Sequence, residues 1–183
     1  MDKALHVLRY INLSRNLALR LSVDKPLNLV CYIDAAHAVH PDKKSQFGSC
    51  IGLGGGHVHW STSGIKMNTK SSAESEFYAP GENVTDAIFL RNYLIEQGYD
   101  LPPVTVYQGN QAAIRLCENG SASSSRTRHI DIRYFFIKDR IENGDIKIAY
   151  LNTKQMIADF LTKPLVGELF YILRDLLLGY TTL

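Results

Sequence analysis

The sequence is poor in cysteine and contains no long apolar run. Its 183 residues include three cysteines, Cys31, Cys50 and Cys117, which are widely spaced and belong to no metal-binding motif. This spacing argues against a disulfide framework or a cysteine-based zinc site, and it indicates isolated, buried thiols in a reducing compartment. No stretch approaches the roughly 18 consecutive apolar residues of a transmembrane helix, and the N-terminus MDKALHVLRY lacks the apolar core of a signal peptide. We therefore expect a soluble, intracellular protein.

The sequence also has little net charge, but its charges are unevenly distributed. Twenty Lys and Arg residues against 18 Asp and Glu residues give a formal charge of +2. Residues 1–70 carry 9 basic and 4 acidic side chains, residues 71–119 carry 2 and 7, and residues 120–183 carry 9 and 7. An acidic middle between basic flanks is typical of a cation-assisted site beside a polyanion, but ordinary variation of a solvated surface explains it equally well.

The pattern of apolar residues predicts a mixed α/β layer fold. Thr153 is expected to cap a short helix that contains Ile157 and Leu161 and ends before Pro164. The order of the elements excludes a repeat array and an all-helical bundle. The other expected helices cover residues 2–12, 71–97, 110–117, 131–143 and 169–177, and the expected strands cover residues 27–33, 47–53, 57–60, 103–108 and 145–152.

Two local features carry further expectations. Pro80 and Gly81 fall inside the helix expected over residues 71–97, where a proline loses a hydrogen bond and costs roughly 3 kcal/mol. We therefore expect a kink or a break near residue 80. The strands expected over residues 47–53 and 57–60 flank three glycines and predict a hairpin, in which His57 and His59 are expected on one exposed strand face beside Trp60.

Three acidic residues are candidates for chemistry. Asp34 follows a strand that is apolar on both faces, and Asp159 lies in the predicted short helix. Glu76 lies about 200° around its helix from Glu74. Glu74 is therefore explained by a capping box with Ser71, whereas Glu76 is expected to face the body of the fold. An acid at the position of Asp34 is more often a turn residue, and one at the position of Asp159 more often interacts favourably with the helix dipole. An acid at the position of Glu76 is more often exposed on the surface.

A series of sequence blocks adds information that periodicity does not carry. The blocks are VLRYI at 7–11, CYIDAAHA at 31–38, KKSQFGSCIGLGGG at 43–56, TKSSAESEFYA at 69–79, VYQGNQAAI at 106–114, SRTRHIDIRYFFIKDRI at 125–141 and IADFLTKPL at 157–165. In these blocks and their order, the chain resembles the RNase H domain of copia-type retrotransposon Pol polyproteins over nearly its whole length. The resemblance implies an RNase H-like fold over residues 26–165, a five-stranded mixed sheet flanked by helices. It also implies a reverse-transcriptase connection remnant in residues 1–25 and a C-terminal amphipathic helix in residues 166–183.

The resemblance further implies a reaction. Domains of this family use four carboxylates to hold two Mg²⁺ or Mn²⁺ ions and hydrolyse the RNA strand of an RNA–DNA hybrid. The resemblance carries three of these acids over as catalytic residues and metal ligands, namely Asp34, Glu76 and Asp159. The remaining acid is expected after the strand VTVYQ, where the family has Asp-Asn-Gln and this chain has Gly109. Gln108 is predicted to point to the opposite face of the strand, so it does not substitute.

The missing acid leaves two interpretations open. Weak or partial metal occupancy and an impaired nuclease are expected if the other ligands remain in place. The alternative is a catalytically inert module that binds the hybrid or packs against a reverse transcriptase domain. A strand-transfer nuclease on a related fold is disfavoured, because the blocks match RNase H throughout. The family resemblance also implies a location in cytoplasmic virus-like particles or in the nucleus, with no membrane partner.

Basic and polar residues beside the acids are candidates for substrate contact. Their donors suit phosphates and ribose hydroxyls, which report the shape of a hybrid rather than its base sequence. Arg126, Arg128 and Arg133 make a second basic patch, which a solvated helix start explains equally well. His129 and Asp131 belong to a matching block, but their position is more typical of helix capping than of catalysis. The substrate candidates are Lys43, Lys44, Ser45, Lys66, Asn68, Lys70, Ser71, Ser72, Asn110 and Gln111.

Overall fold

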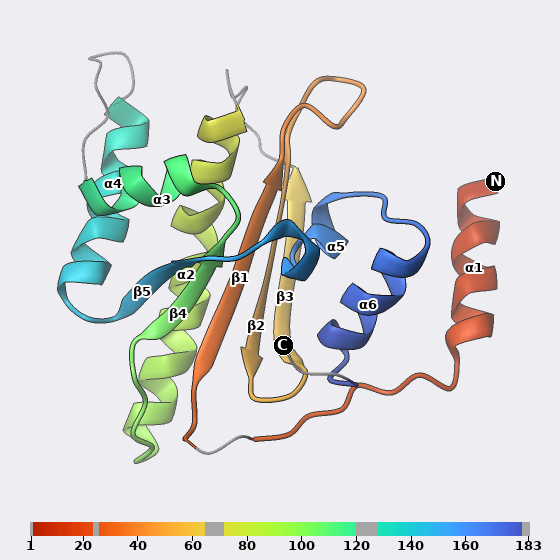
Figure 1. The fold of residues 1–183 in the computed structure, drawn as a ribbon, viewed down its shortest axis with the longest axis horizontal. Coiled ribbons are helices and arrows are strands. Elements are labelled where there is room, and N and C mark those ends of the chain that lie inside the picture. The colour runs from red at the N-terminus through yellow and green to blue at the C-terminus, as the bar shows by residue number, and fades with distance from the viewer. Residues whose placement is uncertain (1, 24–25, 65–71, 120–127, 181–183) are drawn as a thin grey trace.

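The computed structural model describes residues 2–23, 26–64, 72–119 and 128–180, except for the side chains at 72–83, 116, 118–119 and 128–134. Its centre is a five-stranded mixed sheet with the strand order β3-β2-β1-β4-β5 (Figure 1). β1 pairs antiparallel with β2 and parallel with β4, β2 pairs antiparallel with β3, and β4 pairs parallel with β5. This sheet confirms the predicted α/β class. The strands are β1 (Leu29–Ala36), β2 (Gln46–Leu53), β3 (His57–Gly64), β4 (Val104–Gln108) and β5 (Ile146–Tyr150).

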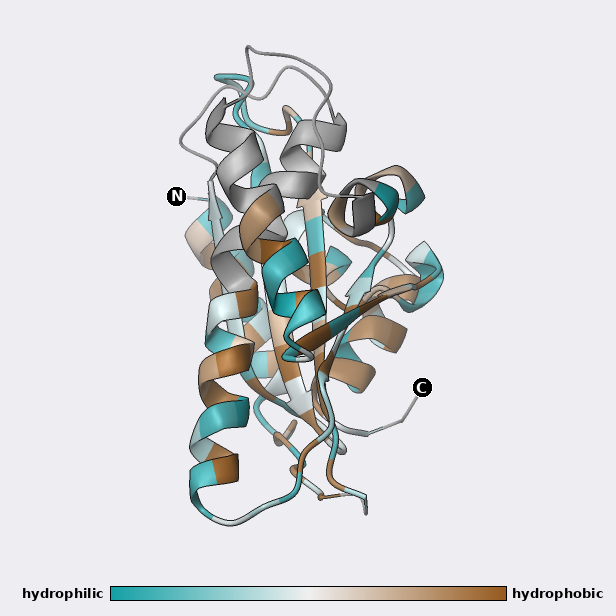
Figure 2. Cartoon of the chain, turned by 90° about the vertical axis from the view of Figure 1, so that its left-hand side faces the viewer, coloured by the Kyte–Doolittle hydropathy of each residue, from teal (hydrophilic) through white to brown (hydrophobic). Residues whose placement is uncertain are grey.

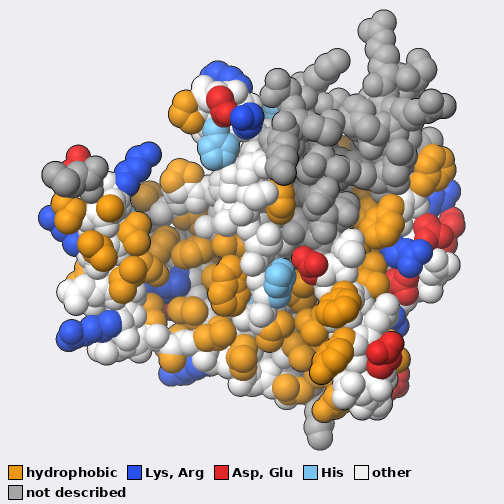
Figure 3. Space-filling model, turned by 180° about the vertical axis from the view of Figure 1, so that it is seen from behind, with side chains coloured by type: hydrophobic (Ala, Val, Ile, Leu, Met, Phe, Trp, Pro, Cys, Tyr) orange, Lys and Arg blue, Asp and Glu red, His pale blue; other side chains and the backbone are white. Residues whose placement is uncertain are grey.

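Helices cover both faces of the sheet. α2, α3 and α4 lie on one side, α5 and α6 lie on the other, and α1 lies beyond α6 (Figure 1). α1 buries none of its residues, and its apolar side chains lie on the surface at the left of Figure 3. Among the residues described, no helix is long and apolar enough to span a membrane. The helices are α1 (Asp2–Ser14), α2 (Ser72–Glu96), α3 (Gln111–Asn119), α4 (Arg128–Glu142), the 3₁₀ turn η1 (Thr153–Gln155), α5 (Asp159–Thr162) and α6 (Glu168–Leu177).

β1 divides the interior into two apolar cores, because its side chains alternate between the two faces of the sheet. Cys31 and Ile33 pack with Val84 of α2 on one face. Tyr32 packs with Leu173 of α6 on the other face. Figure 2 shows hydrophobic and hydrophilic residues alternating along α2 where it runs beside the sheet. All three cysteines are free and buried, as their spacing predicted.

Helix α2 is not interrupted at Pro80 and Gly81, so of the expected kink or break the break does not occur. The helix runs as one element from Ser72 to Glu96. Val84 and Ala87, which follow the proline, are fully buried in the core beside β1. Packing of an apolar face supplies most of the stability of a helix within a protein, and here it offsets the local cost of proline and glycine.

A β-bulge in the hairpin separates two histidines that the strand pattern placed on one face. The pairing of β3 with β2 shifts by one residue between His57 and His59. His57 is therefore buried beside the Tyr32 ring, with its Nδ1 atom 3.2 Å from the carbonyl oxygen of Leu177. His59 lies on the opposite face, 3.4 Å from Asp86 of α2. The prediction of a shared exposed face was wrong.

The turn after β5 also differs from its prediction. Asn152, and not Thr153, is the capping residue, because its side-chain oxygen accepts the Lys154 N–H at 3.0 Å. The turn that it caps is η1, which ends at Gln155. A separate helix, α5, begins only at Asp159. Asp159 is therefore the first residue of α5, a helix of four residues.

The segment between α1 and β1 contacts two distant parts of the chain. The Arg20 N–H donates to a carbonyl oxygen at the end of α6 at 2.8 Å, and the Ser22 N–H donates to the Gly55 carbonyl oxygen at 3.1 Å. A Cβ atom at Gly56 or at Gly179 would lie 2.2 Å from the Arg20 carbonyl oxygen. Only glycine permits these approaches, and residues 20–22 thereby join the β2–β3 turn to the end of α6.

Candidate functional site

The structure brings Asp34 and Asp159 together. Asp34 lies near the end of β1, Asp159 begins α5, and each residue is 5% exposed. α5 reaches this position because Gly48, the partner of Asp34 on β2, has no side chain. A Cβ atom at Gly48 would lie 2.6 Å from the Cβ of Leu161 and 2.9 Å from the Cγ2 of Thr162. The glycine therefore allows α5 to lie directly on the sheet beside Asp34.

Lys163 links the two carboxylates. Its Nζ atom lies 2.7 Å from Oδ1 of Asp159 and 3.3 Å from Oδ2 of Asp34. The Thr162 hydroxyl donates a hydrogen bond to the same Oδ2 of Asp34. Burial first and the charge of Asp34 second raise the pKa of Asp159 to about 6, although Lys163 opposes this shift. Burial lowers the pKa of Lys163, but the two carboxylates outweigh burial and raise that pKa overall.

Three of these residues were not among the candidates from the sequence. Lys163 lies four positions after Asp159 in the block IADFLTKPL, and this spacing brings two side chains together at a helix surface. This spacing could have identified Lys163 from the sequence as a neighbour of Asp159. Thr162 directly precedes Lys163 in the same block. Gly48 gave no such signal, because its need for a small side chain comes from α5, which is distant in the sequence.

Gly109 lies where the missing acid would stand. The parallel register pairs Ile33 with Gln108, so the next pair of positions is Asp34 and Gly109. Gln108 is buried on the α2 face, as predicted, and its Oε1 accepts the Asn110 N–H at 3.1 Å. Among the residues that the structure describes, a Cβ atom at position 109 would meet nothing nearer than a Met156 methyl carbon at 3.8 Å. The backbone therefore has room for a side chain here, but the chain supplies none.

The third predicted acid, Glu76, lies in α2 at a position whose side chain is not described. Within the described part of the chain, no three His, Cys, Asp or Glu side chains are grouped so as to hold a metal ion. Glu76 therefore stays a predicted ligand. The same limit applies to Ser72, Arg128, His129, Asp131 and Arg133 in the helices, and Lys66, Asn68, Lys70, Ser71 and Arg126 lie outside the described residues.

The loop after β1 contains three of the predicted substrate contacts. Lys43 and Lys44 are exposed, and the Lys44 ammonium pairs with Asp42 at 2.8 Å. Ser45 is only 1% exposed, and its hydroxyl accepts the Ala38 N–H at 3.1 Å. The Ser45 side chain is therefore buried within the loop, and its contact with a substrate stays a prediction. The two lysines remain available on the surface.

The start of α3 contains the other two described candidates. The Asn110 side-chain oxygen accepts the N–H groups of Ala112 at 2.9 Å and Ala113 at 3.2 Å, so Asn110 caps the helix. Gln111, the first residue of α3, is exposed. This cap fixes the position of the backbone directly after Gly109.

The carboxylate pair fits a divalent cation. Mg²⁺ and Mn²⁺ prefer oxygen ligands, and carboxylates supply charge as well. Asp34 and Asp159 are buried, and their oxygens already enclose one positive group, the ammonium of Lys163. The donor set therefore suits a cation, whereas Gly109 contributes no ligand to it.

Comparison with curated proteins relates the chain to retrotransposon polyproteins. It is 31% identical over 171 residues to the retrovirus-related Pol polyprotein from transposon TNT 1-94 of Nicotiana tabacum, covering 93% of this chain and 13% of that protein. It is 33% identical to the Pol polyprotein from transposon RE1 of Arabidopsis thaliana, covering 90% of this chain and 11% of that protein. The chain thus spans about a tenth of the length of these curated relatives. No family model matches the chain.

Comparison with solved structures identifies the fold. LC11-RNase H1, isolated from compost by a metagenomic approach, gives a TM-score of 0.54 at 14% identity and covers 74% of this chain and 92% of its own. The PFV RNase H domain gives a TM-score of 0.52 at 14% identity and covers 80% of this chain and 96% of its own. At these identities the likeness establishes the fold alone, and that fold is the RNase H fold.

Proposed function

Because the chain is a relative of copia-type retrotransposon Pol polyproteins and has the RNase H fold, we propose that it is an RNase H-type endoribonuclease domain with a weakened site. Its substrate is the RNA strand of an RNA–DNA hybrid, and its reaction is metal-dependent hydrolysis of a phosphodiester. The observation that carries this proposal is the buried pair of Asp34 and Asp159, which face one cationic group. The substrate class comes from the family, and LC11-RNase H1 has been solved in complex with an RNA/DNA hybrid.

Asp34 and Asp159 would hold the catalytic cation, and the family resemblance assigns Glu76 as a further ligand. A divalent cation held by these residues would supply Lewis-acid chemistry, namely activation of water and stabilisation of negative charge on the attacking and leaving oxygens. The residues of the chain prepare the site. The Thr162 hydroxyl orients Asp34 through its hydrogen bond, and α5 fixes Asp159 at its first residue. Burial strengthens the electrostatic attraction of both carboxylates for a cation, because the surrounding dielectric constant is lower than that of water.

Gly109 is the reason to expect a weak enzyme. The missing carboxylate removes one ligand and one negative charge from a site that must compensate divalent cations. Loss of electrostatic stabilisation of roughly 3–4 kcal/mol corresponds to a factor of about 10²–10³ in rate. We therefore expect slow cleavage in Mg²⁺ or Mn²⁺, with partial occupancy of the metal positions.

The same glycine favours a second candidate function. A domain that keeps its fold but lacks a ligand can act as an inert module that binds the hybrid or packs against a reverse transcriptase. Lys43 and Lys44, which are exposed and independent of the missing carboxylate, would then supply phosphate contacts. Hybrid binding without cleavage distinguishes this function from the first.

Single-turnover cleavage of a labelled hybrid tests the proposal. The wild-type protein, Gly109→Asp and Asp34→Asn are compared in Mg²⁺ and in Mn²⁺. We expect slow cleavage by the wild type, faster cleavage by Gly109→Asp and none by Asp34→Asn. Inactivity of both the wild type and Gly109→Asp, in samples shown to be folded, would refute the enzymatic proposal. Hybrid binding by the same samples would then support the inert module.

A further inference from the structure

Lys163 lies in the space between the two carboxylates that a shared cation would need. Its Nζ contacts one oxygen of each carboxylate, Oδ1 of Asp159 at 2.7 Å and Oδ2 of Asp34 at 3.3 Å. Both carboxylate side chains are 7% exposed, whereas the lysine side chain is 36% exposed. Two buried like charges are unfavourable unless a group of opposite charge pairs with them. The ammonium group therefore allows the two carboxylates to lie together when no metal is bound.

The position of Lys163 is determined by the backbone. The residue ends α5 in an extended conformation, with φ −127° and ψ 143°, and its N–H donates to the Asp159 carbonyl oxygen at 3.0 Å. Pro164 follows and prevents the helix from continuing. The side chain has a flexible four-carbon stem and is partly exposed. Its charged head can therefore leave the carboxylates without movement of the backbone.

A divalent cation held by Asp34 and Asp159 would compete with Lys163 for their carboxylate oxygens. The two positive groups exclude each other from that space and repel each other at short distance. Gly109 makes the competition stronger, because it removes the negative charge that would help to compensate both groups. The lysine thus favours the metal-free state of this site.

We propose that Lys163 is a built-in counter-cation that stabilises the Asp34–Asp159 pair without metal and competes with a divalent cation for it. This inference rests on the proposed function in one respect, namely that these two carboxylates are metal ligands. It adds that the affinity of the site for metal is set in part by a residue that is not itself a ligand. Metal binding and metal-free stability therefore change in opposite directions when the lysine loses its charge.

The test compares Lys163→Met, which keeps a long apolar stem, with Lys163→Arg, which keeps the charge. Mn²⁺ affinity is measured by titration calorimetry, and thermal unfolding is measured in EDTA. Lys163→Met is expected to bind Mn²⁺ about tenfold more tightly and to melt about 3–6 °C lower in EDTA. Lys163→Arg is expected to stay close to the wild type in both measurements. Lys163→Gln provides a second neutral variant if Lys163→Met does not fold.

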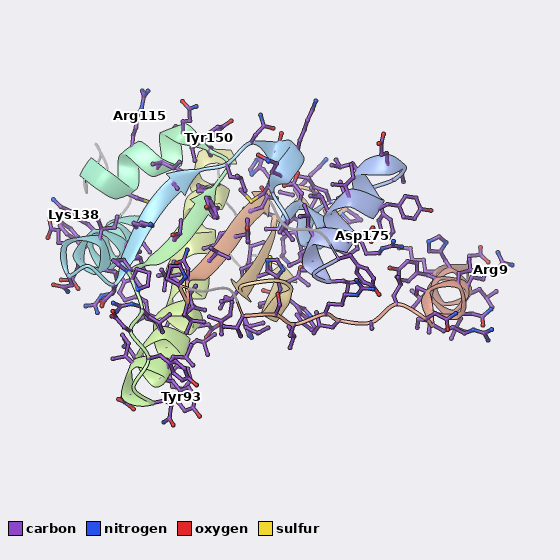
Figure 4. All side chains as sticks on the ribbon, turned by 60° about the horizontal axis from the view of Figure 1, so that its bottom comes forward. Arg9, Tyr93, Arg115, Lys138, Tyr150 and Asp175 are labelled. Carbon is purple, nitrogen blue, oxygen red and sulfur yellow. The ribbon has the colours of Figure 1, made fainter. Side chains whose placement is uncertain are left out.

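Lys138 offers a matched control. Its ammonium group pairs with Glu142 at 3.7 Å over the same four-residue spacing, and its side chain is also 36% exposed. Figure 4 shows Lys138 on α4, on the opposite side of the sheet from α5. Lys138→Met should therefore leave Mn²⁺ affinity unchanged. A gain of affinity in this variant equal to that of Lys163→Met would overturn the inference, because a general charge effect would explain both.

Asp159→Asn separates the inference from the proposed function. If Asp159→Asn abolishes Mn²⁺ binding but the wild type and Lys163→Met bind with equal affinity, the competition by Lys163 is refuted and the metal site stands. If neither the wild type nor a folded Lys163→Met or Lys163→Gln protein binds Mn²⁺, both the inference and the metal-dependent function are refuted. Tighter binding by Lys163→Met that is lost in the Asp159→Asn background would support both.

Discussion

Replacement of Gly109 by aspartate is expected to make the stability of the protein depend on divalent metal. The register places position 109 beside Asp34, and a Cβ atom there would make ordinary van der Waals contacts with Met156 and Leu151 at 3.8 and 3.9 Å. Adjacent strands lie about 4.8 Å apart, so the new carboxylate would stand about 5 Å from that of Asp34. At an effective dielectric constant of about 20, two unit charges at this distance repel by about 3 kcal/mol. Without metal, the free energy of unfolding should fall by up to about this amount, because Lys163 is already shared by two carboxylates.

Urea unfolding of Gly109→Asp in EDTA and in excess Mg²⁺ measures this effect. Gly109→Asn is the matched control, because asparagine has nearly the same shape and no charge. We expect Gly109→Asp to be less stable than Gly109→Asn in EDTA and to recover in Mg²⁺, since the cation neutralises the added charge. Hybrid cleavage should rise by a factor of about 10²–10³ in the same variant, the inverse of the expected loss.

The comparison with asparagine also defines the result that would refute the reasoning. Equal stability of the two variants in EDTA, together with equal responses to Mg²⁺, would mean that a carboxylate at position 109 does not face Asp34. Recovery of stability in Mg²⁺ without faster cleavage would mean that metal binding is restored but another defect limits the reaction. The first outcome would show that the inferred register at position 109 is wrong, and the second would show that the remaining ligands are misplaced.

Three further predictions concern pH, packing and hybrid binding. The raised pKa of Asp159, about 6, means that the folded protein keeps a proton that the unfolded chain releases. In metal-free buffer the free energy of unfolding should therefore fall as the pH rises from about 4 to about 6, by up to about 2 kcal/mol after allowance for solvent screening. An equal dependence of the free energy of unfolding on pH in Asp159→Asn would contradict this prediction. Gly48→Ala should lower the free energy of unfolding by about 1–3 kcal/mol in urea, because its methyl group overlaps α5. Gly64→Ala is the control, because a Cβ atom there meets no described atom nearer than 4.0 Å, and equal effects would contradict the packing argument. Replacement of both Lys43 and Lys44 by glutamine should weaken hybrid binding at low salt and reduce the slope of log affinity against log salt by about 2; an unchanged slope in a filter-binding assay would remove them from the interface.

The strands of the sheet and the place of Asp34 followed from local patterns, whereas the assignment of Asp34 and Asp159 to one site came from the family resemblance. β1 was predictable because it is apolar on both faces, and only a central strand buries both. Asp34 ends that run, so its place at the end of a buried strand was visible in the sequence. The side of β4 on which Gly109 lies followed from the alternation of strand residues. The burial of a strand and the direction of its side chains depend on residues that are close in the sequence, so the periodicity of apolar residues predicts them.

The features that escaped prediction depend on contacts between distant segments. The bulge that separates His57 from His59 arises from a shift in pairing with β2, and the strand pattern alone carries no sign of it. Helix α2 passes through Pro80 because the residues that follow pack in the core. The role of Lys163 required the three-dimensional position of Asp34, which lies far away in the sequence. Tertiary packing therefore overrode local propensity at each of these points.

The hydrogen bonds of residues 20–22 also determine how the molecule carries mechanical load. The segment is bonded to the end of α6 through Arg20 and to the β2–β3 turn through Ser22, and it lies before β1 along the chain. A force applied through α1 therefore acts on these bonds before it reaches the strand that carries Asp34. The close approach of Gly56 and Gly179 to the Arg20 carbonyl oxygen keeps the three segments together at one point. The segment thus acts as a clamp, and tension on α1 is expected to open this clamp before it displaces the carboxylates.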